Sequence, residues 1–351
     1  HRHPLCGRNF EYYSEDPLVT GKMGAAMVRG IEGQGVGTSV KHFVANNQET
    51  NRTNNDVRIS ERALREMYLK GFEIIVNEAN PSTIMSSYNK INGVQVAEDR
   101  RILTDILRGE WGYDGLVMSD WFGGKDAVAM VNAGNDLLEP GTKRQWDALT
   151  EGYENGTLNE QNINTSTARI LRFIFGTAKM KGSEISNAPN LEAHTAITRQ
   201  SATEGMILLK NNNNVLPLKV EKEAALIGVH SFQFIAGGTG SGDVNEAYTV
   251  SLQEGLANAG VPLNNEAVSV FEKAVAADPE AFDVPEGITA MFNPYQAPQL
   301  EYSVEQYEQF AKSSDVAILT IGRNAGEGGD RVIEDDFKLT TAELDMLDKT
   351  C

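Results

Sequence analysis

The sequence predicts an α/β protein, with a (β/α)8-type TIM barrel that lacks its N-terminal strands and then a partial α/β/α sandwich domain. Three observations predict this fold class. Short apolar runs alternate with amphipathic helical stretches as far as about residue 176, which is typical of a parallel sheet covered by helices. Polar residues recur where the apolar runs end, as they do at the rim of a closed barrel. A stretch rich in Gly, Ser, Asn and Pro then separates these runs from a second set.

The first domain is expected to contain four strands, joined by helices that carry ordinary start and stop signals. The strands are predicted at residues 36–43, 84–88, 115–119 and 136–140. Ser60 is a typical helix N-cap, and apolar side chains recur behind it at helical spacing from Leu64 to Ile75. A helix around residues 102–107 stops at Gly112, and the last helix of this domain spans about residues 160–176.

The second domain is predicted from two continuous apolar runs, residues 224–229 and 316–321, which are typical of buried parallel strands. Each run leads into a glycine-rich loop, the first over residues 237–243 and the second over 322–330. We therefore place the partial barrel in residues 1–180, a linker in 181–195 and the partial sandwich in 196–351.

Both ends of the chain indicate a piece of a longer protein. The chain begins inside a dense motif, and Thr340 with Glu343 forms a capping box that predicts a helix close to Cys351. A helix capped in this way usually runs further. We therefore expect the remaining segments of the same protein to be needed for activity, and residues 1–351 alone to be aggregation-prone or inactive.

The composition excludes several classes of function. The chain has 351 residues, of which 40% are hydrophobic and 23% charged, as in ordinary globular domains. No apolar run reaches the roughly 18 residues of a membrane span, and no Lys/Arg cluster offers a footprint for nucleic acid. A net charge of −18 suits a neutral substrate better than an anionic one. The two cysteines and five histidines follow no disulfide or zinc pattern, so we expect no metal and no cofactor.

Asp120 is the first candidate for a catalytic residue. It follows the apolar run of residues 116–118 and is followed by Trp121, so a carboxylate and an indole come together at the C-terminal end of a predicted strand. A carboxylate beside an aromatic ring is also how proteins grip and cleave sugars. The alternative is a helix N-cap aspartate next to a tryptophan of the core.

The glycine-rich loops have two interpretations. Loops of this kind can hold phosphate, but neither one has the P-loop or G-x-G-x-x-G spacing, and the second carries Glu327 and Asp330, which would repel phosphate. A nucleotide-binding α/β protein is therefore the weaker hypothesis. The glycines instead let the backbone turn tightly and hold a carboxylate over a neighbouring site.

Five motifs, taken in order, closely resemble family 3 of the glycoside hydrolases, in its β-glucosidase branch. They are PLCGRNFE (residues 4–11) leading into SEDP (14–17), KHFVANNQE (41–49), MSSYN (85–89), MSDW (118–121) and GEGGDR (326–331). The resemblance covers nearly the whole chain. The family's upstream Asp-Gly-Pro segment, whose aspartate holds distal sugar hydroxyls, does not occur here. Val44-Ala45 replaces the Pro-Gly of the hexosaminidase relatives, which favours a glucosidase.

The resemblance implies a retaining double displacement in which Asp120 is the nucleophile and Glu327 the general acid/base. It also implies a set of substrate-binding residues, which are Arg8, Lys41, His42, Arg52, Tyr88, Trp121, Met85 and Ser241. Positive charge nearby should keep Asp120 ionised. Glu327 has to carry a proton near neutral pH, so we expect its pKa to be raised by Asp120 and by burial.

Each of these residues also has a purely structural interpretation. Arg8 could pair with Glu11 or Glu15, and Arg52 could simply be solvated. Lys41 and His42 could be part of the barrel rim, Tyr88 could belong to the core, and Glu327 could be a loop charge. Met85 is better explained by packing than by contact with a ligand.

The function that the resemblance implies is an exo-acting β-glucosidase, with β-xylosidase as the neighbouring specificity and a non-catalytic carbohydrate-binding fragment as the alternative class. The expected partners are a small oligosaccharide or β-glucoside, the remaining segments of the same protein, and a second copy in a homodimer. No nucleic acid and no membrane are expected. The compartment stays open between the bacterial cytoplasm and the periplasm or exterior.

Overall fold

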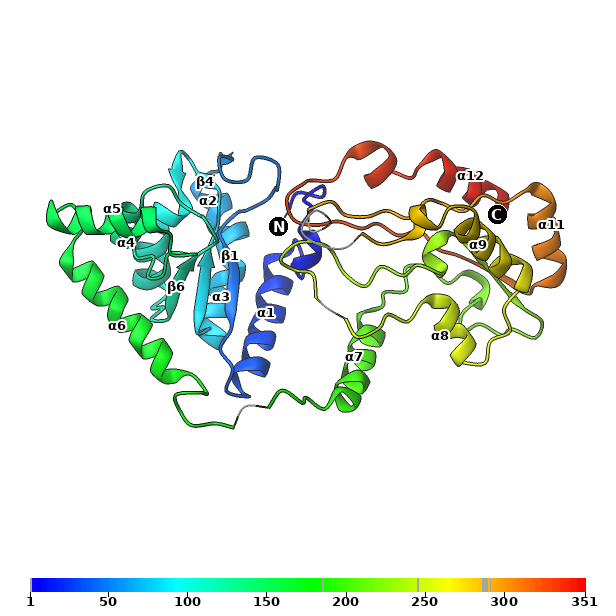
Figure 1. The fold of residues 1–351 in the computed structure, drawn as a ribbon, viewed down its shortest axis with the longest axis horizontal. Helices are drawn as coiled ribbons and strands as arrows, with labels where there is room; N and C mark the ends of the chain where they lie inside the picture. Colours follow the sequence, from blue (N-terminus) through cyan, green and yellow to red (C-terminus); the bar gives the residue numbers. More distant parts are fainter. Residues whose placement is uncertain (1, 185, 245, 286–289, 291) are drawn as a thin grey trace. The chain divides into compact units, whose positions relative to one another are not determined.

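The computed structural model describes residues 2–184, 186–244, 246–285, 290 and 292–351. Grouped by their contacts, the residues form two compact units (Figure 1). The first unit contains the chain up to Glu184 together with two short segments from later in the sequence, Gly240–Gly242 and Ala325–Arg331. The second unit contains the remaining residues. Ile185, in the predicted linker, lies outside the described residues, and helix α7 (Leu191–Gly205) begins within that linker at its N-cap Asn190.

A parallel sheet organises the first unit. Its strands are β1 (Ser39–Phe43), β3 (Thr83–Ser86) and β6 (Leu116–Ser119), in the order β1-β3-β6. All pairings in this sheet are parallel, as predicted. The predicted strand at 136–140 is wrong as a strand, because only an isolated bridge joins Leu137 to Met118. The described residues thus form an open arc, and a closed barrel is not present among them, since closure takes about eight strands.

Helices follow the strands in the alternation that the sequence predicts. They are α1 (Pro17–Glu32), the continuous α2–η2–α3 (Glu61–Ala63, Leu64–Leu69, Lys70–Ala79), η4 (Arg101–Glu110), α4 (Ala127–Ala133), α5 (Lys143–Glu154) and α6 (Glu160–Gly176). The predicted N-cap is confirmed, because the Ala63 N–H donates to the Ser60 hydroxyl at 3.3 Å. Helices α1 and α3 pack side by side next to β1 (Figure 1). A second, small sheet joins β2 (Asp56–Val57), β4 (Lys90–Ile91) and β5 (Val94–Gln95).

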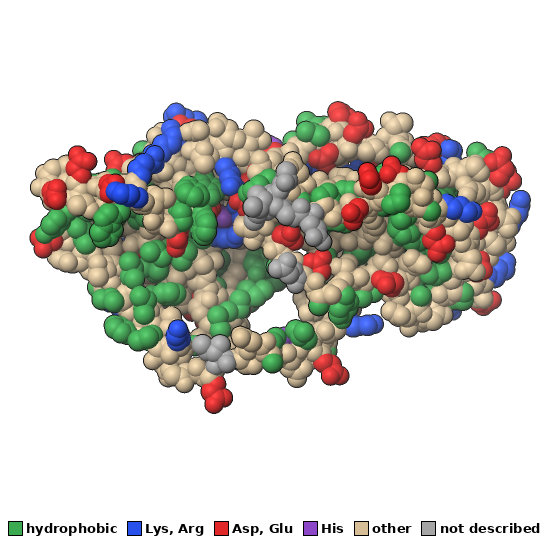
Figure 2. Space-filling view, viewed as in Figure 1, with side chains coloured by type: hydrophobic (Ala, Val, Ile, Leu, Met, Phe, Trp, Pro, Cys, Tyr) green, Lys and Arg blue, Asp and Glu red, His purple; other side chains and the backbone are tan. Residues whose placement is uncertain are grey.

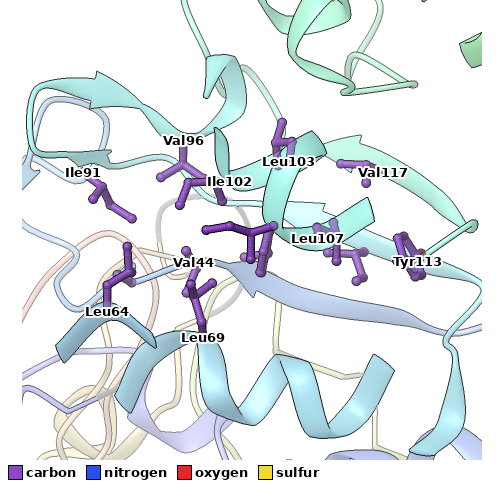
Figure 3. Packing of buried hydrophobic residues seen from close by; sticks show 14 of the residues in the cluster. Val44, Leu64, Leu69, Ile91, Val96, Ile102, Leu103, Leu107, Tyr113 and Val117 are labelled. Atoms are coloured by element: carbon purple, nitrogen blue, oxygen red, sulfur yellow. The ribbon is translucent and has the colours of Figure 1, made fainter. Parts of the chain in front are cut away.

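The core of the first unit lies between the parallel sheet and the helices on one of its faces. Figure 3 shows Val117 of the sheet and side chains of η4, such as Leu103 and Leu107, pointing toward one another, with Leu64 and Leu69 of η2 closing the other side. These side chains are almost fully buried. The core therefore fixes the positions of the strands, and with them the residues that follow each strand.

The second unit is built around β7 (Ala224–Ile227) and β8 (Val316–Leu319), a parallel pair. Its helices include α8 (Leu252–Asn258), α9 (Asn265–Ala277), α11 (Val304–Ser313) and α12 (Thr341–Thr350). Helix α9 packs on β7, while α11 and α12 pack on β8. The capping box predicted for Thr340 and Glu343 is confirmed at the start of α12. On the face drawn in Figure 2, acidic side chains are dispersed over the surface of this unit.

Candidate active site

The ends of the parallel strands bring the first candidate residues together. Asp120 directly follows β6, Tyr88 follows β3, and His42 lies near the end of β1. Asp120 is 8% exposed, and its Oδ1 accepts a hydrogen bond from the Trp121 N–H at 2.7 Å. Its Oδ2 lies 3.4 Å from His42 Nε2 and receives no hydrogen bond of ordinary geometry from any described residue. This buried carboxylate oxygen is therefore free to meet an electrophile.

The surroundings of Asp120 disfavour its charge. Burial raises the pKa of Asp120 above its ordinary value, although the Trp121 amide, the nearby Tyr88 hydroxyl and the cations of Arg8 and Arg52 act in the opposite direction. That hydroxyl donates to the Trp121 carbonyl at 2.8 Å, so Tyr88 is both buried and satisfied. The alternative interpretation of Tyr88 as a core residue is thus partly right, although its hydroxyl also lies near the Asp120 carboxylate.

His42 is held by a residue that the sequence analysis missed. The Tyr12 Oη lies 2.5 Å from His42 Nδ1, and the same Oη accepts the backbone N–H of His42 at 3.3 Å. Burial and then the cations of Arg8, Lys41 and Arg52 bring the pKa of His42 well below its ordinary value. The imidazole is therefore neutral, and one of its nitrogens faces Asp120.

Glu327 comes to the same cluster on the glycine-rich loop Ala325–Arg331, which belongs to the first unit. Its Oε1 lies 2.7 Å from Arg52 Nη1 and 3.6 Å from Arg8 Nη1, and its Oε2 accepts the Ser241 N–H at 2.9 Å. Gly240 has a φ of 97°, and a Cβ there would meet the Glu327 Cβ at 2.3 Å. The loop before Ser241 can therefore pack against Glu327 only because residue 240 is glycine.

The charge state of Glu327 differs from the expectation. Although burial opposes ionisation, the hydrogen bonds from Ser241 and the cations of Arg8 and Arg52 lower the pKa of Glu327 to about 2. The expectation of a raised pKa is wrong for this structure, because it considered Asp120 and burial and left out the two arginines. In this arrangement Glu327 is ionised near neutral pH, which suits a base and not an acid.

Arg8 and Arg52 are each shared between two carboxylates, and Lys41 pairs with Glu11. Arg8, 1% exposed, makes two hydrogen bonds to Glu11 at 2.6 and 2.8 Å and one to the Ser241 Oγ at 3.1 Å. Lys41 lies 3.1 Å from the same glutamate. Arg8 does pair with Glu11, as its structural interpretation predicted. The pair is buried, however, and Arg8 also lies 3.6 Å from Glu327.

Arg52 connects the strand ends with the loop. Its Nη1 lies 2.7 Å from the Glu49 Oε2 as well as 2.7 Å from Glu327, and its guanidinium stands 4.5 Å from the centre of the Tyr88 ring. Its alternative as a solvated loop residue is wrong. Planar stacking and shared hydrogen bonds of this kind are what a guanidinium can make and an ammonium cannot.

Two further candidates differ in their surroundings. Trp121 is 58% exposed, with its ring edge-on to Phe122 at 6.3 Å, so it is not the core tryptophan of the alternative interpretation. An exposed indole beside a carboxylate can stack on a sugar ring. Met85 lies inside β3, opposite Met118 of β6. Across the described parts of the chain, no hydrogen bond or ion pair links Met85 with the cluster, as its packing interpretation expects.

Four residues of the cluster were missed as functional candidates: Tyr12, Glu11, Glu49 and Asp330. Two of them could have been found, because Glu11 and Glu49 each stand three residues from a candidate arginine, a spacing at which side chains meet in a turn. Tyr12 and Asp330 gave no such local signal, since their partners lie far away in the sequence.

A cavity of about 400 Å³ adjoins this cluster in the first unit. Its walls come from α1, β1 and α3, and they include Lys41 and His42 but neither Asp120 nor Glu327. The charged cluster, and not the cavity, therefore defines the candidate site. Among the residues placed by the structure, no group of three or more His, Cys, Asp or Glu side chains could hold a metal ion. Nor is any described helix both long and apolar enough to cross a membrane.

Two family models together match most of the chain. The glycosyl hydrolase family 3 N-terminal domain matches residues 1–173, and the C-terminal domain of the same family matches residues 206–351. The chain belongs to family 3 of the glycosyl hydrolases. The members it resembles include beta-glucosidase B of Emericella nidulans, 42% identical over 268 residues, which are 73% of this chain and 31% of that protein.

Other relatives agree over longer stretches. Thermostable beta-glucosidase B of Acetivibrio thermocellus is 36% identical over 94% of this chain and 41% of its own length. Beta-glucosidase 3B from Thermotoga neapolitana, solved in complex with alpha-D-glucose, superposes on this family 3 chain with a TM-score of 0.93 at 38% identity. That match covers 100% of this chain and 50% of the solved one. The chain thus spans half or less of the length of these relatives.

Proposed function

We propose that the protein containing this chain is an exo-acting, retaining β-glucosidase that removes terminal β-D-glucosyl residues. The observation that carries this proposal is one cluster that holds two buried carboxylates in opposite settings. Asp120 offers an oxygen that receives no hydrogen bond from the residues that the structure describes, and Glu327 is held by two arginines. Retaining glycosidases need a nucleophile and a separate acid/base of this kind.

In the proposed first step, Asp120 Oδ2 attacks the anomeric carbon while Glu327 gives a proton to the departing oxygen. The glycosidic bond breaks and a glycosyl ester forms. In the second step Glu327 takes a proton from water, whose oxygen displaces Asp120 and releases β-glucose. Because Glu327 is ionised while it is paired with Arg52, substrate has to weaken that pair, and Glu327 has to take up a proton from solvent, before the first step. In the second step Glu327 acts as a base, which the ionised carboxylate paired with Arg52 can do.

The other cluster residues are proposed to bind and orient the sugar. Lys41, His42, Arg8 and Arg52 would donate to hydroxyls of the ring, and the Trp121 indole would stack on its face. We further propose that the β1-β3-β6 arc is part of a (β/α)8 barrel completed by other segments of the same protein, and that the β7-β8 pair belongs to an α/β/α sandwich.

The test is an assay of the full-length protein with p-nitrophenyl β-glucoside, and with the β-xyloside and β-N-acetylglucosaminide for comparison. We expect the glucoside to be the best substrate, with β-glucose as the first product by proton NMR. α-Glucose as the first product would exclude the retaining mechanism. Sugar binding without turnover would indicate a carbohydrate-binding protein, and preference for the xyloside would indicate a β-xylosidase.

A further inference from the structure

We propose that Asp330 is a positioning residue for Glu327, and that it works by fastening the glycine-rich loop to two distant segments of the first unit. This inference rests on the proposed function, in which Glu327 is the acid/base. Asp330 itself touches neither substrate nor reacting atoms. Its role would be to set where the Glu327 carboxylate stands.

The Asp330 carboxylate accepts three backbone hydrogen bonds. Its Oδ1 accepts the Glu49 N–H at 2.8 Å and the Gly7 N–H at 3.4 Å, and its Oδ2 accepts the Thr50 N–H at 2.9 Å. The donors lie close in sequence to the two arginines, because Gly7 directly precedes Arg8 and the pair Glu49-Thr50 shortly precedes Arg52. One side chain therefore binds the loop to the backbone beside both arginines that hold Glu327.

The backbone of the loop makes matching contacts around Glu327. The Gly328 N–H donates to Glu49 Oε2 at 3.0 Å, and the Arg331 N–H donates to the Leu5 carbonyl at 2.8 Å. A Cβ at Gly7 would lie 2.0 Å from the Gly329 oxygen and 2.3 Å from the Gly326 oxygen. The loop thus lies directly on residue 7, which has to be glycine for the approach.

The composition of the loop explains why a fastening residue is needed. Of the two residues on each side of Glu327, three are glycine: Gly326, Gly328 and Gly329. Such a segment has many backbone conformations of similar energy. Asp330 is the side chain that selects one of them, so removing its charge should spread Glu327 over several positions. A misplacement of about 1 Å in a catalytic group can slow a reaction by about a hundredfold.

The experiment compares Asp330→Asn with wild type in the full-length protein, using two classes of substrate. The asparagine keeps the size of the side chain, but its NH₂ group has to face one of the three donor N–H groups. We expect kcat/KM for an alkyl β-glucoside, whose leaving group needs a proton, to fall by about tenfold to a hundredfold. For 2,4-dinitrophenyl β-glucoside, which needs little protonation, we expect a much smaller fall.

Two further variants keep the result interpretable. Asp335→Asn removes an exposed carboxylate five residues later and should leave both substrates unaffected. Gly7→Ala places a Cβ against the Gly326 and Gly329 oxygens of the same loop. It should reproduce the leaving-group dependence of Asp330→Asn, so that it answers the question if Asp330→Asn does not fold. Azide should accelerate turnover in either loop variant, as it would for a displaced acid/base.

The outcomes separate the inference from the proposed function. An equal loss for both substrates in Asp330→Asn and Gly7→Ala would overturn the positioning role, because damage to the fold alone slows both classes alike. A fall in kcat/KM confined to the alkyl glucoside, with azide raising kcat for the 2,4-dinitrophenyl glucoside, would support it. A wild-type protein that hydrolyses neither substrate would instead refute the proposed function itself.

Discussion

The candidate site has two halves that are built in different ways. Asp120 follows β6 and His42 lies near the end of β1, two strands of one parallel sheet with β3 between them, over a core of fully buried side chains. Glu327 stands on a loop whose anchoring pair, Gly7 and Asp330, is 323 residues apart in sequence. The first half is rigid because the sheet is rigid, whereas the second half depends on a few hydrogen bonds to backbone.

The two halves also differ in electrostatics. Asp120 is surrounded by groups that do not fully compensate its burial, so its pKa is raised. Glu327 accepts hydrogen bonds from Ser241 and is paired with two guanidinium groups, so its pKa falls to about 2. The strand half therefore holds a buried carboxylate whose charge is disfavoured, while the loop half holds an ion pair that substrate has to disturb.

The largest expected effect is on the strand half. Asp120→Asn should lower kcat by at least about a thousandfold, because an amide cannot form the glycosyl ester. The measurement is turnover of p-nitrophenyl β-glucoside, together with peptide mapping after a 2-fluoro glucoside inactivator. We expect the label on Asp120 in the wild type. A label on any other carboxylate would remove Asp120 from the role of nucleophile.

The next effect is on the loop half and has a different form. Glu327→Ala should leave formation of the glycosyl ester from activated glucosides nearly intact, while hydrolysis of the ester slows by about a hundredfold or more for lack of a base. Burst kinetics followed by a slow steady state would report this. Added azide should restore turnover and give β-glucosyl azide. An α-azide product would contradict the retaining mechanism.

The sequence was informative to different degrees for the two halves. Alternating apolar runs and helices placed β1, β3 and β6 and their parallel order, because the period of a strand and the cap at Ser60 are local properties. In place of the strand expected at 136–140 there is only a single bridge from Leu137 to Met118. Whether an apolar segment pairs as a strand depends on the adjacent strand and not on the segment's own sequence alone. Where Asp120 stands was therefore predictable from residues close to it.

For the loop half, local sequence gave little. Nothing near Glu327 predicts that Arg8 and Arg52 meet it, so only the resemblance singled it out, and its pKa was expected to move the wrong way. The fastening by Asp330 was missed for the same reason. Long-range contacts of a glycine-rich loop leave no periodic pattern, because the loop has no period to follow.

The electrostatic contrast predicts opposite effects on stability. At pH 7, Asp120→Asn should raise the unfolding free energy, because it removes a buried charge whose pKa is raised. Glu327→Gln should lower it by about 1–3 kcal/mol, because Arg8 and Arg52 lose a charged partner. Thermal or urea unfolding of the full-length protein checks both.

The pH dependence of the second variant has a fixed sign. A carboxylate with a depressed pKa in the folded state stabilises the protein above its unfolded pKa, and that contribution is lost as pH falls toward the folded pKa. The difference between wild type and Glu327→Gln should therefore shrink as pH falls from 4.5 toward 2. A difference that is constant over this range would mean that Glu327 is not held as an ion.

The smallest expected effect on activity is that of Tyr12→Phe. Tyr12 contacts His42, which in turn faces the Asp120 carboxylate. The Tyr12 Oη accepts the His42 backbone N–H and also lies 2.5 Å from His42 Nδ1. We take the hydroxyl as the donor to Nδ1, which places the His42 proton on Nε2, the nitrogen 3.4 Å from Asp120 Oδ2. The opposite tautomer would aim a lone pair at the carboxylate. In Tyr12→Phe the constraint is lost and the ionised form of Asp120 becomes less favourable, so its pKa should rise further. One lost hydrogen bond, about 0.5–1.5 kcal/mol, corresponds to a fall in kcat/KM of about twofold to tenfold.

Because Asp120 has to be ionised to attack, the acid limb of the pH profile of kcat/KM should move to higher pH in Tyr12→Phe. Tyr13→Phe, at a neighbouring tyrosine that is 47% exposed, is the control and should leave that limb in place. If the limb does not move in Tyr12→Phe, Tyr12 acts by packing alone, and the neutral His42 has to owe its orientation to the cations around it.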